Sequence, residues 1–152
     1  MKREDTIEVI NSLITINNDR IEGYETASKE TEEPDLKSLF SQFISTSQRC
    51  KQELVSEVHL LGGQASEGTT TSGKFFRVWM DLKAALTGKD RKAILNSCEY
   101  GEEKAIETYD KVIQNELKHL SAEQHFMINT QKSLLRADHD RVKALRNALV
   151  DA

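Results

Sequence analysis

Four long stretches of this chain repeat apolar residues every three or four positions, with almost nothing to interrupt them. That spacing places the apolar side chains on one face of an α-helix. The chain has one Pro and seven Gly among its 152 residues, so few positions force a helix to end. The sequence therefore predicts an all-α fold made of a few long helices.

Residues with known capping preferences mark the expected ends of these helices. We expect the helices at about 6–29, 34–61, 91–118 and from just after Ser121 to about 150. The terminal signals are Asp5 with Glu8, Pro34, Gly62 with Gly63, Asp90, and Ser121 with Gln124. The whole chain, 1–152, is then a single domain.

The segment between the second and third helices, residues 62–89, is much longer than the other two links. It opens with a polar loop and continues as a short amphipathic helix carrying Phe75, Phe76, Trp79 and Met80. Short links produce two antiparallel hairpins, and the long link lets the second and third helices run parallel. This is the one-crossover, ferritin-like four-helix bundle. We expect the aromatic cluster to dock the short helix onto the bundle; a partner-binding or membrane patch is the alternative.

Polar residues interrupt each apolar face at a similar height in the expected bundle. They are Asn17, Ser47, Glu102 and Asp138, with Gln131 beside them. Because the two hairpins are symmetric about their turns, these residues should share one layer of the core. In ferritin-like proteins that layer holds two metal ions.

Two interpretations of this layer remain open. A dinuclear centre needs a Glu from two helices and a Glu-x-x-His from each of the other two, whereas this chain offers only Glu102 and Asp138. Its one Glu-x-x-His, Glu116 to His119, lies at a turn. We favour a structural layer without a cofactor. In this layer, burial beside Asp138 raises the pKa of Glu102. The hydroxyls of Tyr24 and Tyr109 supply hydrogen bonds. The alternative is a degenerate iron or manganese site at Glu102 and Asp138.

Several other functions are not favoured. The net charge of -4, without a basic stripe, argues against nucleic-acid binding. No apolar run suits a signal peptide or membrane span, so a cytoplasmic protein without membrane contact is expected. Residues 68–74 resemble the start of a phosphate-binding loop, but Phe75 stands where a hydroxyl is required and no strand precedes. Cys50 and Cys98 should be reduced and buried, and His125 and His139 exposed to solvent.

The chain resembles a bacterial four-helix-bundle family of unknown function in the ferritin-like superfamily. The matching residues are Leu13 to Asn17, Asp19, Gly23-Tyr24, Leu60 to Gly63, Arg77, Trp79, Met80, Leu82, Lys83, Gly101 to Glu103, Tyr109, His139-Asp140 and Leu145-Arg146. The resemblance implies the fold and a bacterial origin, and it brings no established activity. We therefore expect a non-enzymatic bundle that acts as a homo-oligomer or through a protein partner. By analogy with related proteins, its role would lie in stress physiology.

Overall fold

A computed structural model describes residues 2–69 and 73–150, with side chains for 2–69 and 77–149. Within these ranges every regular element is helical, which confirms the all-α prediction. The elements are α1 (Arg3–Glu30), α2 (Pro34–Leu60), α3 (Gly73–Thr87), α4 (Arg91–Asn115), the 3-10 turn η1 (Leu117–His119) and α5 (Ala122–Val150).

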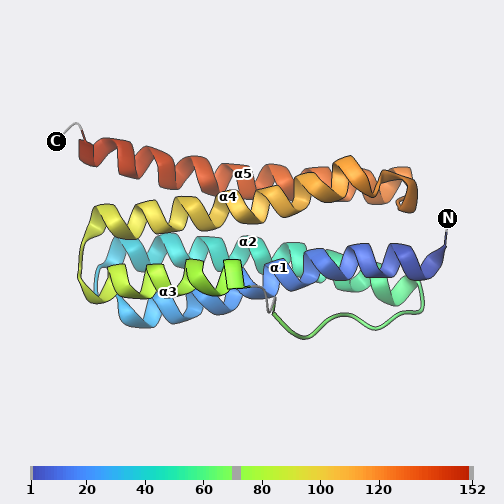
Figure 1. Cartoon of the computed structure of the whole chain (residues 1–152), viewed down its shortest axis with the longest axis horizontal. Coiled ribbons are helices and arrows are strands. Elements are labelled where there is room, and N and C mark those ends of the chain that lie inside the picture. Colours follow the sequence, from blue (N-terminus) through green and yellow to red (C-terminus); the bar gives the residue numbers. More distant parts are fainter. Residues whose placement is uncertain (1, 70–72, 151–152) are drawn as a thin grey trace.

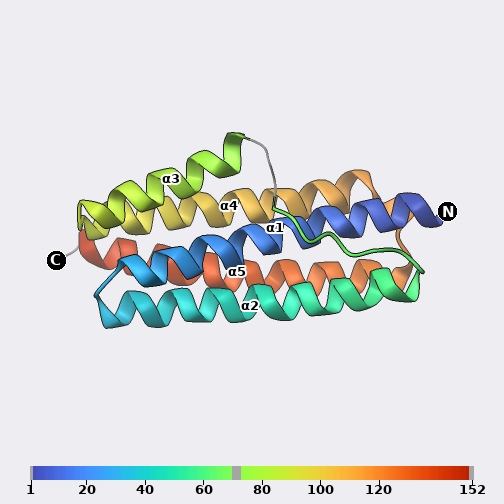
Figure 2. The same ribbon diagram turned by 90° about the horizontal axis from the view of Figure 1, so that it is seen from below.

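The four long helices lie side by side, and each hairpin pairs helices of opposite direction (Figures 1 and 2). One hairpin is α1 with α2, and the other is α4 with α5. After α2 the chain returns along α1, and α3 continues toward the end where α2 began, so α2 and α4 run in the same direction (Figure 1). None of the helices in the described ranges combines the length and apolar character that a membrane span requires.

Polar side chains on one flank of α1 hold the returning chain in place. Asn11 Nδ2 donates to the Gln64 carbonyl at 3.0 Å, and the Ser66 N–H donates back to Asn11 Oδ1 at 2.8 Å. About two helical turns further along α1, Asn18 Nδ2 donates to the Gly68 carbonyl at 2.9 Å. The loop expected to be polar is thus hydrogen-bonded to α1. Part of the phosphate-loop-like stretch 68–74, namely 70–72, lies outside the described residues.

Most of the expected helix ends are confirmed. Pro34 lies in the first turn of α2, and Gly62 takes a φ of 78° just after that helix ends. Asp90 Oδ1 accepts the Ala93 N–H at 3.2 Å. A reciprocal capping box begins α5: the Ser121 N–H donates to Gln124 Oε1 at 2.9 Å, and the Gln124 N–H donates to Ser121 Oγ at 3.1 Å.

Two end predictions were wrong. Asp5 does not cap α1; the helix begins at Arg3, so that Glu4 and Asp5 lie in its first turn. Negative charge is favourable there because the N-terminal end of a helix dipole is positive. The third long helix stops at Asn115 rather than 118, and a short 3-10 turn completes the link to α5.

The short helix α3 docks on α1 and α4 where two glycines leave room for it. A Cβ built on Gly23 of α1 would stand 2.5 Å from the Trp79 ring, and one built on Gly101 of α4 would stand 2.9 Å from Val78 Cγ1. Trp79 also meets the Tyr24 ring edge-on, at 5.3 Å between centroids. This confirms the docking of α3 through its described residues. The side chains of Phe75 and Phe76 lie outside them.

The core is divided along its length into two apolar halves. One half surrounds Leu13, Leu54 and Ile106, and the other surrounds Phe40, Leu95 and Val142. The two cysteines are buried and free, as expected. Between the two halves all four long helices contribute buried polar side chains, and the site described next lies there.

Candidate functional site

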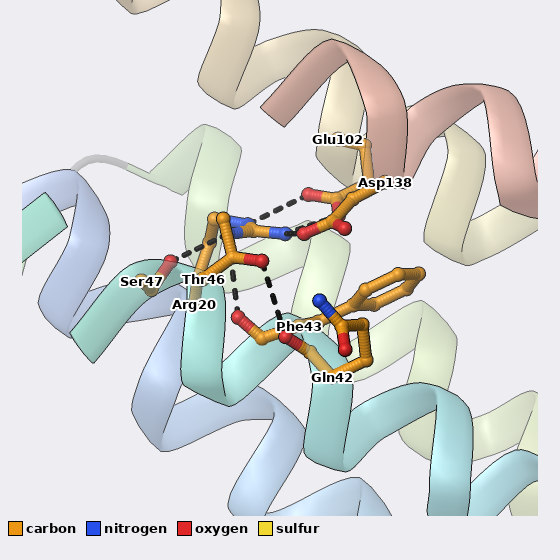
Figure 3. Close-up of polar contacts among 7 residues, drawn as sticks. All are labelled: Arg20, Gln42, Phe43, Thr46, Ser47, Glu102 and Asp138. Atoms are coloured by element: carbon orange, nitrogen blue, oxygen red, sulfur yellow. Dashed lines mark hydrogen bonds and ion pairs between the residues drawn. The ribbon is translucent and has the colours of Figure 1, made fainter. Parts of the chain in front are cut away.

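A buried arginine occupies the centre of the polar layer (Figure 3). Arg20 Nε donates to Glu102 Oε2 at 2.7 Å, and its Nη2 forms a second, short contact with Glu102 Oε1. The same Nη2 reaches Asp138 Oδ2 at 3.2 Å, while Nη1 donates to Ser47 Oγ at 2.5 Å. One guanidinium from α1 therefore joins residues of α2, α4 and α5.

Aromatic rings enclose the rest of the guanidinium. The Arg20 Cζ lies 5.7 Å from the centroid of Tyr24 and 5.7 Å from that of Phe43. Such contacts are attractive because the face of an aromatic ring carries negative potential. With its side chain 2% exposed, Arg20 is surrounded by protein on every side. We call Arg20, Ser47, Glu102 and Asp138 the ion-pair layer.

The ion-pair layer has more acid than base, since one guanidinium faces two carboxyl groups. Burial raises the pKa of Glu102 and of Asp138, and the charge and hydrogen bonds of Arg20 oppose that rise. Burial alone would lower the pKa of Arg20, but Glu102 and, more weakly, Asp138 hold it above its ordinary value. Arg20 is therefore charged throughout the range in which the fold is stable.

A second polar network lies next to the ion-pair layer, on the side toward the N-terminus of α1. Asn17 Nδ2 donates to Tyr109 Oη at 2.9 Å, and Tyr109 Oη donates to Gln131 Oε1 at 2.7 Å. Gln131 Nε2 in turn donates to the Cys50 carbonyl at 3.3 Å and to Glu53 Oε1 at 3.1 Å. These hydrogen bonds also join residues of all four long helices. The two adjacent networks therefore fix the relative positions of the helices.

The five residues expected in one layer are all buried, but they divide between these two networks. Ser47, Glu102 and Asp138 meet at Arg20, whereas Asn17 and Gln131 meet at Tyr109. The expected rise in the pKa of Glu102 through burial is present, but Arg20, which we did not expect there, contacts both carboxylates and opposes that rise. The expected role of Tyr24 was wrong: its hydroxyl is buried without a hydrogen-bond partner among the described residues, and its ring packs instead.

The ion-pair layer does not suit a dinuclear iron or manganese centre. Its donor set has two carboxylates and no imidazole, and the guanidinium already contacts both carboxylates. A metal ion between Glu102 and Asp138 would stand against a fixed positive charge in a region of low dielectric. The Glu116–His119 pair lies at the α4–α5 turn, with 3.5 Å between His119 Nε2 and Glu116 Oε2.

A third group of charged residues lies where α4 and α5 face each other, and we did not expect it from the sequence. We expected His139 to be exposed to solvent, but it is buried, with its ring nitrogens close to Glu99, Glu103 and Asp140. The spacing of the sequence could have indicated this burial. His139 follows Leu135 by four positions and precedes Val142 by three, which places it on the apolar face of the helix. His125 is half-buried and pairs with Asn129.

The fold and its ion-pair layer define an all-helical protein whose core is crossed by buried charge. The chain belongs to the family described as "Domain of unknown function (DUF2383)", whose model matches residues 5–115. The match runs from the first turn of α1 to the end of α4 and includes Arg20 and Glu102. No curated protein matches the chain.

Proposed function

We propose that the chain is a ferritin-like four-helix bundle of bacterial origin that acts without catalysis, by self-assembly or by binding a protein partner. The direction of the helices supports this fold, because two antiparallel hairpins joined by one long crossover is the ferritin-like connectivity. The ion-pair layer supports the non-enzymatic role. Ferritin-like metal sites lie in the core of the bundle, and the polar layer of this core contains the side chain of Arg20.

The observation that carries the proposal is the closed shell around that guanidinium. Arg20 is 2% exposed and hydrogen-bonds to two carboxylates and a hydroxyl. A catalytic centre needs an open position that a substrate or a reactive oxygen species can reach. The residues of the ion-pair layer come from all four long helices. The layer is therefore suited to fixing the register of the helices rather than to catalysis.

Large apolar side chains are exposed at the end of the molecule where α2 finishes and α5 begins, and this exposure supports association there. Leu60 of α2 is 81% exposed and Phe126 of α5 is 75% exposed. Leu117, in the 3-10 turn between α4 and α5, is half exposed. Gln124 Nε2 donates to Glu57 Oε1 at 2.9 Å, which holds these two helix ends together. We call Leu60, Leu117 and Phe126 the end patch. Large apolar side chains exposed at one end of a molecule commonly take part in protein-protein contacts.

Multi-angle light scattering over a range of protein concentrations tests the proposal. We expect the wild type to form a defined oligomer or, in a pull-down with its host proteins, to retain a specific partner. The double substitution Leu60→Lys with Phe126→Lys should abolish that association. Tyr100→Lys is the matched control, since Tyr100 is also exposed but lies midway along the molecule on α4. A wild type that stays monomeric and retains no partner overturns the proposal.

A further inference from the structure

Glu99, Glu103 and His139 bring three potential metal ligands together outside the ion-pair layer. The two glutamates lie one turn apart on α4, and the histidine faces them from α5. His139 Nε2 stands 3.2 Å from Glu103 Oε1 and 3.8 Å from Glu99 Oε1. One ligand atom from each of the three residues lies within 4.8 Å of the others.

The orientation of the imidazole favours a cation at this position, because both ring nitrogens face carboxylate oxygens. Its Nδ1 lies 3.1 Å from Asp140 Oδ1, where it can donate a hydrogen bond. A neutral imidazole carries one proton, so a proton on Nδ1 leaves a lone pair on Nε2. That lone pair would then point at two carboxylate oxygens, which is unfavourable in a side chain that is only 7% exposed. A second proton or a metal ion relieves the repulsion.

The two distances from His139 Nε2 to the glutamate oxygens are compatible with tetrahedral coordination. Zinc bonds to histidine nitrogen and carboxylate oxygen are about 2.0–2.2 Å long, which places neighbouring ligand atoms of a tetrahedron roughly 3.4 Å apart. The distances from Nε2 to Glu103 and Glu99, 3.2 and 3.8 Å, lie on either side of that value. We propose that Glu99, Glu103 and His139 bind one divalent transition-metal ion of the zinc class, with water as the fourth ligand.

The surroundings of the cluster provide the second shell that such a site needs. Arg146 forms an ion pair with Glu99 Oε2, which leaves Glu99 Oε1 available to the metal. Asp140 orients the imidazole through Nδ1, the arrangement that typically supports a metal-bound histidine. With a neutral imidazole, the three carboxylates and one guanidinium leave two negative charges, which a divalent ion balances. Glu103 is 54% exposed and leaves the site open to solvent.

The choice of metal class follows from the donor set. One imidazole nitrogen with two carboxylate oxygens suits zinc and its first-row neighbours better than magnesium or calcium, which prefer oxygen alone. The ion would join α4 to α5 across their interface, and its binding would stabilise that hairpin. This inference goes beyond the proposed function and does not depend on it, because the end patch and the cluster share no residue.

Titration of the chelator-treated full-length chain with zinc chloride, followed by calorimetry, tests the site. We expect saturable binding of about one ion per chain, weakened at least about tenfold in Glu103→Gln and abolished in His139→Ala. Glu103 is mostly exposed, so its substitution leaves the fold intact even if loss of the buried histidine does not. Cobalt substituted for zinc should give the intense visible absorption of a tetrahedral site.

His119→Ala is the matched control, because His119 also lies near two carboxylates but on an exposed turn. Its nitrogens stand 3.5 Å from Glu116 and 3.9 Å from Asp5. We expect this variant to bind zinc as the wild type does. The proposal is overturned if the wild type shows no saturable zinc binding, or if Glu103→Gln and His139→Ala bind zinc as tightly as the wild type.

Discussion

Replacing Glu102 by glutamine tests how the ion-pair layer contributes to stability. Glu102 presents two acceptor oxygens to the Nε and Nη2 groups of Arg20. Glutamine has the same shape but offers one acceptor and one NH2 donor, so an N–H of Arg20 must face another donor. The substitution also leaves the buried guanidinium with a single charged partner, Asp138, through one contact at 3.2 Å.

The magnitude follows from the cost of leaving a buried charge poorly compensated. Removing one partner of a buried pair costs about 3–5 kcal/mol. Because Asp138 and one amide oxygen remain to accept from Arg20, we expect Glu102→Gln to lower the free energy of unfolding by about 2–4 kcal/mol. For a chain of this length the melting temperature should then fall by about 4–16 °C.

Thermal unfolding followed by circular dichroism, with chelator present throughout, measures the effect. Asp138→Asn is the matched control, because it leaves the bidentate pair of Arg20 and Glu102 intact and electrically neutral. We expect that variant to stay within about 1 kcal/mol of the wild type. A Glu102→Gln protein that melts at or above the wild-type temperature would refute this reasoning, since it would show that Glu102 is not an essential ionised partner.

Three further predictions follow from other parts of the structure. Gly23→Ala should cost about 1–3 kcal/mol of stability, because its Cβ would overlap the Trp79 ring, and urea denaturation measures this. Cys50 and Cys98 should resist alkylation at pH 8 in the native protein, because burial raises the pKa of Cys50 to about 11 and that of Cys98 further still; mass spectrometry detects labelling only after unfolding. Asp35→Asn should lower the melting temperature slightly at pH 7. This difference should shrink below about pH 4 and vanish once pH falls below the lowered pKa of Asp35, because the hydrogen bond from Arg91 on α4 lowers that pKa and its stabilisation is lost on protonation.

Each of these has its own control. Gly68→Ala should be harmless, because a Cβ at that position meets nothing within 4 Å. Labelling of the native cysteines at the rate of an exposed thiol would show that the core opens readily. Arg91→Gln removes the partner of Asp35, so it should abolish the difference between the Asp35→Asn variant and its parent at pH 7.

Helical periodicity predicted the long helices well because burial and spacing agree along most of the chain. Every residue of the expected apolar face of α2 is buried except Leu61, which is half-buried at the helix end. Arg20 was not expected in the core, although it follows Asn17 by three positions and precedes Tyr24 by four. A charged residue is ordinarily assigned to solvent. Glu102 and Asp138 lie on the apolar faces of two other helices, and two buried acids require a cation nearby. That requirement could have indicated that Arg20 is buried.

The position of the buried charge could not be derived from one helix alone. Whether Arg20 is buried depends on Glu102 and Asp138, which are 82 and 118 residues away in the chain. His139 illustrates the same limit, since its carboxylate neighbours on α4 become visible only when α4 and α5 are placed face to face. Side chains that pair across helices are therefore the part of the site that requires the three-dimensional structure.

The packing of Trp79 against Gly23 gives the protein an intrinsic fluorescent probe of this contact. The chain has a single tryptophan, so all indole fluorescence comes from the contact between α3 and α1. The emission wavelength should report separation of α3 from the long helices, while far-ultraviolet circular dichroism follows the helices themselves. If α3 detaches first, the two signals will change at different denaturant concentrations, and the crossover segment can be studied without any introduced label.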